Sequence, residues 1–131
     1  MKTKSLWLSC AVGALVASTA AWAGYKSSTY VNINTTTRVA YGAMGSARSS
    51  TDTNQSIGCF VQGFSSGTNS VICQAYNASG TTIYCSSNAP AIVTAAASIS
   101  DSSYIYFTWD VGGACTALTV SNDSMYAPRQ P

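Results

Sequence analysis

The spacing of Cys59, Cys73 and Cys85 constrains the fold of this chain more than any other feature, because all three fall into register when the segment around them forms two hairpins. The expected strands are 56–62, 70–76 and 81–86. In antiparallel pairing Cys59 faces Cys73 and Cys73 faces Cys85, and the small apolar residues fall on the same side of the sheet. A buried face specifies the register of a sheet in this way. The sequence therefore predicts a three-stranded meander.

Four of the five cysteines follow residue 23, and four cysteines allow three disulfide connectivities. Cys59 and Cys85 lie on the outer strands of the predicted meander, so their Cα atoms are roughly 9–10 Å apart. A disulfide requires about 7 Å or less. The chain therefore pairs either Cys59 with Cys73 and Cys85 with Cys115, or Cys73 with Cys85 and Cys59 with Cys115. The first connectivity is favoured because it ties the meander to the last strand across a loop of about 30 residues.

Runs rich in β-branched and aromatic residues predict further strands on either side of the meander. These strands are 29–34, 37–42, 103–109 and 115–121. The last two form a hairpin in which Trp109 is expected to face Cys115. The pairs that follow along this hairpin are Phe107 with Ala117 and Ile105 with Thr119.

One helical pattern stands out, over residues 89–99. Asn88 is a candidate cap for this helix, and Pro90 suits its first turn because the first helical N–H needs no partner. The predicted fold class is thus all-β and mainly antiparallel. It is a small disulfide-bonded β-sandwich or flattened barrel, with one short helix near 89–99.

The amino terminus has the features of a bacterial secretory signal peptide. Lys2 and Lys4 precede an apolar stretch, and the small-residue ending Ala21-Trp22-Ala23 predicts cleavage after Ala23. No later segment approaches the roughly 20 apolar residues of a membrane span. We expect residues 1–23 to be a signal peptide and 24–131 to be a single exported domain, secreted or periplasmic.

The charges beyond the predicted signal peptide cancel. Four are positive and four are negative, which gives zero, so the net charge of +2 comes from Lys2 and Lys4. The eight are Lys26, Arg38, Arg48, Arg129, Asp52, Asp101, Asp110 and Asp123. A neutral surface has no electrostatic footprint for nucleic acid or anionic lipid.

The chain lacks the usual catalytic side chains, since it contains neither histidine nor glutamate. It therefore cannot build a Ser-His-Asp site, a Cys-His site or a histidine-ligated metal site. The hydrolase-like pattern from Gly63 to Gly67 lies at a hairpin tip and has no histidine partner. Asp101 and Asp110 stand about 30 Å apart along one strand. We predict no catalytic residue, no metal and no cofactor, and hence a protein that is not an enzyme.

The candidate binding residues alternate with the cysteines along the meander. They are Phe60, Gln74, Tyr76 and Tyr84, joined on the same side by Ile72 and Thr82. Tyrosine rings interleaved with amides on a flat sheet are suited to stack on sugars and hydrogen-bond to them, so the predicted ligand is a carbohydrate or surface glycan. The alternative is that this side is the inner face of the sandwich, with the disulfides toward solvent, or is covered by residues 29–42. Tyr104 and Tyr106 present the same choice on their own strand.

Two other functions remain open. Segment 42–55 is expected to be the longest loop, with Arg48 and Asp52 spaced to form an ion pair, and long loops on rigid sheets often carry function. A secreted inhibitor or effector would present this loop to an envelope or extracellular protein. A structural coat, matrix or fibre subunit would instead self-associate through sheet edges and the uncharged surface.

Overall fold

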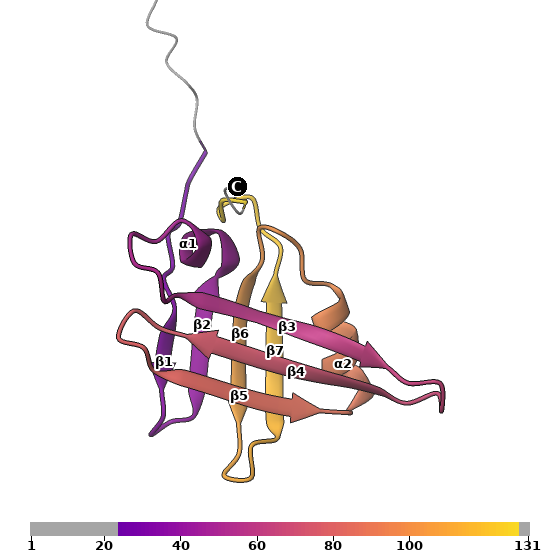
Figure 1. Ribbon diagram of the computed structural model, residues 1–131. Coiled ribbons are helices and arrows are strands. Elements are labelled where there is room, and N and C mark those ends of the chain that lie inside the picture. Colours follow the sequence, from indigo (N-terminus) through magenta and orange to yellow (C-terminus); the bar gives the residue numbers. More distant parts are fainter. Residues whose placement is uncertain (1–23, 129–131) are drawn as a thin grey trace, which may run out of the picture.

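The computed structural model describes residues 24–128 and shows two antiparallel sheets packed face to face (Figure 1). One sheet has the order β1(Asn32–Asn34), β2(Val39–Ala43), β6(Tyr104–Trp109), β7(Cys115–Ser121). The other has the order β3(Ser56–Gly63), β4(Asn69–Tyr76), β5(Thr82–Ser87). The strands of the second sheet run across those of the first, and neither sheet closes into a barrel. The predicted all-β class is confirmed, as a small β-sandwich. The predicted signal peptide lies outside the described residues.

The meander has the predicted register. Cys59 lies opposite Cys73, and Cys73 lies opposite Cys85. Burial alternates along β4, with Val71, Cys73 and Ala75 fully buried on the side that faces the other sheet. This alternation has the period of two that a half-buried strand requires.

The last hairpin confirms only part of the predicted register. Trp109 lies opposite Cys115, but a β-bulge between Thr108 and Trp109 shifts the rest of the pairing. Phe107 therefore faces Leu118 rather than Ala117, and Ile105 faces Val120 rather than Thr119. A bulge places two residues of one strand against one of its partner, which displaces every later pair.

One of the two helices was predicted from the sequence, and the other was not. Helix α2(Pro90–Ala97) confirms the helical pattern, but its N-cap is Ala89 with no side-chain hydrogen bond, so the predicted Asn88 cap is wrong. Helix α1(Met44–Arg48) was not expected, because it lies in the segment predicted as the longest loop. That segment begins inside β2, and only residues 49–55 connect α1 to β3.

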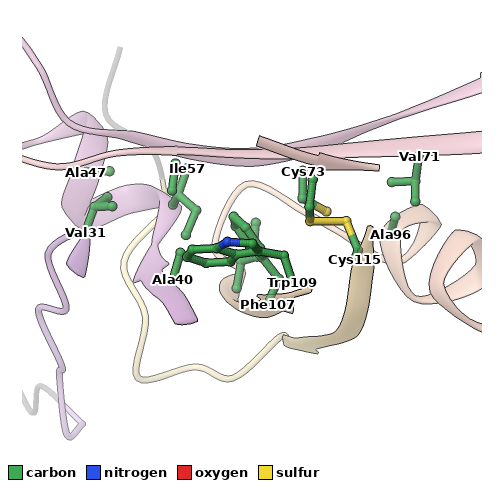
Figure 2. Packing of buried hydrophobic residues seen from close by; sticks show 13 residues of the cluster. Val31, Ala40, Ala47, Ile57, Val71, Cys73, Ala96, Phe107, Trp109 and Cys115 are labelled. Atoms are coloured by element: carbon green, nitrogen blue, oxygen red, sulfur yellow. A yellow bond between two sulfur atoms is a disulfide. The ribbon is translucent and has the colours of Figure 1, made fainter. Parts of the chain in front are cut away.

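The core lies between the sheets and centres on Trp109 (Figure 2). The Trp109 ring lies between Ala40 and Cys115 in this view, and its centroid is 6.0 Å from that of Phe107. Ile57 and the buried residues of β4 close the core from the side of the meander.

The disulfides follow the favoured connectivity. Cys59 bonds to Cys73 within the meander, and Cys85 bonds to Cys115 between the two sheets. Two disulfides suit a secreted or periplasmic protein, since such compartments are oxidising. No helix among the described residues has both the length and the apolar character needed to cross a bilayer.

Candidate functional site

The outward side of the meander, called here the front face, points to solvent. It consists of Phe60, Ile72, Gln74, Tyr76, Thr82 and Tyr84, and it faces the viewer in Figure 1. Phe60 and Tyr84 are each 47% exposed, whereas Cys73 and Ala75, which point the other way, are fully buried. The alternative that this side forms the inner face of the sandwich is therefore wrong. The exposed aromatic side chains make the front face the candidate site.

The strand register brings Gln74 and Tyr84 together at the centre of the front face. Tyr84 lies directly opposite Gln74 on β5, and Gly58 lies opposite Gln74 on β3. A Cβ atom added at Gly58 would meet nothing within 4 Å. Gln74 thus has an aromatic ring on one flank and open space on the other, so a ligand can reach its amide. Gly58 was not among the predicted site residues.

Tyr76 holds the ring of Tyr84 in place. The two rings pack edge to face, with centroids 5.8 Å apart and an interplanar angle of 90°. Their hydroxyl groups hydrogen-bond to each other. A ring fixed in this way loses little conformational freedom on binding, which favours affinity.

A shallow groove continues the front face on the β5 side of Ile72. Its volume is about 390 Å³, and it is lined by Ser70, Ile72, Ser86, Ser87, Asn88 and Ala114. Ile72 is its one large apolar lining residue and lies opposite Phe60 on β3 and opposite Ser86 on β5. The sequence did not reveal this groove, because Ala114 comes from the distant β6–β7 hairpin. Its hydroxyl and amide groups are suited to bind a polar, uncharged ligand.

The tyrosines of the other sheet are arranged differently. Tyr104 stacks on Tyr126 with centroids 5.3 Å apart, and Tyr41 lies 6.5 Å from Tyr106 and 6.4 Å from Tyr104. Burial, and then the neighbouring tyrosines, raise the pKa of Tyr104. These rings cover one another, so their faces are less available to a ligand than that of Tyr84.

Asp52 organises the connection between α1 and β3. Its carboxylate accepts hydrogen bonds from the backbone N–H groups of Asn54 and Gln55, at 2.9 and 3.0 Å, and from the Gln55 side chain at 2.6 Å. These bonds, led by that of the Gln55 side chain, lower the pKa of Asp52. Arg48 is the last residue of α1. The carboxylate of Asp52 thus bonds to Asn54 and Gln55, and its pairing with Arg48 stays a prediction.

Asp110, Asp123 and the four cysteines have structural roles. Asp110 accepts the N–H groups of Gly112 and Ala114 in the β6–β7 turn, and Asp123 accepts that of Met125. The four cysteines of the domain are bound in disulfides. Within residues 24–128, no three such side chains gather closely enough to hold a metal ion.

Comparison with the known protein families, with curated proteins and with solved structures found no match for this chain. The function is therefore inferred from the geometry of the front face.

Proposed function

We propose that this protein is a non-enzymatic, exported binding domain whose front face binds an uncharged carbohydrate or surface glycan. The observation that carries the proposal is the half-exposed ring of Tyr84, which Tyr76 holds in place directly beside the amide of Gln74. A sugar ring has an apolar C–H face and a rim of hydroxyl groups. Tyr84 and Phe60 would stack on the first, while Gln74 would hydrogen-bond to the second.

The charge distribution favours a neutral ligand. No residue from Thr53 to Ser100 carries a charge, and this stretch contains the whole meander and α2. An anionic ligand would lose its hydration on this face without gaining an ionic partner. A neutral glycan has no such cost, and the hydroxyl-lined groove beside Ile72 would accommodate further sugar units.

Calorimetric titration of the oxidised protein tests the proposal. The probes are a neutral glucan, a neutral mannan, an N-acetylglucosamine polymer and an acidic polysaccharide. We expect saturable binding to one neutral class and none to the acidic one. Trp109 is 8% exposed and lies in the core, so heat is a better readout than tryptophan fluorescence.

Matched variants assign the site. Tyr84→Ala is expected to weaken binding about tenfold or more, as loss of a central aromatic contact does. Tyr25→Ala removes a tyrosine that is 79% exposed near the amino terminus and should leave affinity unchanged. Both variants should keep the wild-type melting temperature within a few degrees, because neither ring belongs to the hydrophobic core. Equal affinity of Tyr84→Ala and wild type, or no binding to any neutral glycan, would contradict the proposal.

A further inference from the structure

Strand β3 is a sheet edge whose free backbone groups can be identified residue by residue. β3 pairs only with β4, and Phe64 at the start of the turn donates its N–H to the carbonyl of Thr68 at 2.9 Å. Hydrogen-bonded and non-hydrogen-bonded pairs alternate along an antiparallel ladder. Cys59, Val61 and Gly63 therefore occupy non-hydrogen-bonded positions, and their N–H and C=O groups point away from β4.

Two distances support this assignment. The Cα atoms of Cys59 and Cys73 are 4.0 Å apart, and non-hydrogen-bonded pairs are the closer ones. On the opposite edge of the sheet, the same alternation predicts that Ser86 points its N–H outward. That group donates to the carbonyl of Gly113 at 3.1 Å. The β5 edge is thus partly occupied, whereas among residues 24–128 no hydrogen bond reaches the outward groups of Cys59, Val61 or Gly63.

The β3 edge lacks four of the features that normally prevent edge-to-edge pairing. Natural sheets protect their edges with charged side chains, prolines, bulges or very short strands. β3 has eight residues with no charge and no proline, and its register with β4 is regular. Its outer half is exposed, with Val61 at 41% and Phe64, just beyond the strand, at 49%. The β3–β4 hairpin also projects beyond the four-stranded sheet (Figure 1).

We propose that β3 pairs antiparallel with β3 of a second copy of this chain, so that two meanders form one six-stranded sheet. The occupant is a second copy because an uncharged edge offers a charged peptide no electrostatic partner, while two identical neutral edges meet without repulsion. A two-fold axis makes each contact twice. Only the odd-numbered residues of β3 have free N–H and C=O groups. The register must therefore place odd-numbered residues of one copy opposite odd-numbered residues of the other. This proposal does not depend on the glycan proposal.

The pairing has a geometric consequence. The two-fold axis that relates adjacent antiparallel strands is perpendicular to the sheet, so both front faces lie on the same side of the dimer. The two Phe60 side chains then lie on either side of the axis, and the two Tyr84 side chains lie farther out.

Sedimentation of the oxidised protein over a concentration series tests the proposal. We expect a monomer–dimer equilibrium. Val61→Pro removes an N–H that β4 does not use, and Gln62→Lys places a charge on the edge, so each should weaken dimerisation at least tenfold. Thr82→Lys adds the same charge at the β5 edge and should dimerise like the wild type. Melting temperatures show whether each variant is folded.

Amide hydrogen exchange gives a second readout that needs no variant. Protection of Cys59, Val61 and Gly63 should rise with protein concentration, whereas Phe60 and Gln62 should be protected at every concentration because they bond to β4. A wild-type protein that stays monomeric up to about 1 mM overturns the proposal. So does open-ended assembly beyond a dimer, or a folded Val61→Pro variant that dimerises like the wild type.

Discussion

At the scale of single residues, Asp52 and Gln55 brace the connection between α1 and the meander. The Gln55 side chain donates to Asp52 and accepts the backbone N–H of Val31 at 2.8 Å. One carboxylate thus links the 49–55 segment to the chain just before β1. Such a network could not be predicted from the sequence, because Val31 is 24 residues from Gln55 and its partner there is a backbone group.

We expect Asp52→Ala to destabilise the protein at pH 7 and to matter less at pH 3. The pKa of Asp52 is lowered in the folded state. Its contribution to stability is therefore present above the unfolded pKa of about 3.9 and is lost as the pH falls through the lower folded value. The midpoints of urea unfolding for the wild type and the variant at pH 7 and pH 3 measure this loss of stability. If the variant and the wild type differ in urea midpoint by the same amount at both pH values, the charge of Asp52 does not contribute to stability.

At the scale of elements, the meander could be predicted because its pairing is local and leaves a mark in the sequence. Consecutive strands, short turns and three cysteines in alternating positions all specify the same register. The pairing of β2 with β6 has no comparable local pattern in the sequence, since about 60 residues separate the two strands. The bulge near Trp109 was missed, although it moves the inward side of β7 from the odd-numbered Cys115 to the even-numbered Leu118 and Val120.

Helix α1 was missed for a different reason. It has five residues, including Gly45 and Ser46, and such residues favour turns over helices. The glycine is needed for packing: a Cβ at Gly45 would lie 1.9 Å from the backbone oxygen of Ala127. The helix thus forms where the carboxy-terminal segment packs against it, a contact that the sequence does not reveal.

Gly45→Ala is expected to reduce the free energy of unfolding by about 1–3 kcal/mol, the usual cost of overpacking. The carboxy-terminal segment must move away, so the amide of Ser27, which donates to Met125 at 2.9 Å, should exchange faster. Gly58→Ala is the matched control, because its methyl group meets open space. The control should stay within about 0.5 kcal/mol of the wild type. Equal stabilities for the two variants would contradict the packing argument.

The candidate site was only partly accessible from sequence. Alternation placed Phe60, Gln74, Tyr76 and Tyr84 on one side of the meander, and the register confirms this grouping. Alternation could not decide which side faces solvent, because both sides carry apolar residues. That choice depends on the other sheet, where Ile105, Phe107 and Trp109 project toward the cysteine side.

At the scale of the whole molecule, Cys85–Cys115 is the one disulfide that joins the two sheets in the described part of the chain. Replacing both cysteines by alanine should reduce the free energy of unfolding by about 3–4 kcal/mol, from the entropy of a 30-residue loop. Replacing Cys59 and Cys73, which close a 14-residue loop, should cost about 3 kcal/mol. Chemical denaturation measures both. A loss below about 1 kcal/mol for the first pair would show that packing alone holds the sheets together.

The order of the cysteines has a consequence for how the protein acquires these bonds. Cys59 pairs with Cys73, and Cys85 pairs with Cys115, so each bond joins neighbours in the series. A chain that enters an oxidising compartment amino-terminus first presents each of these thiols immediately before its native partner. An oxidant that couples thiols in their order of arrival would then form both native bonds directly, without the slow exchange of mispaired disulfides.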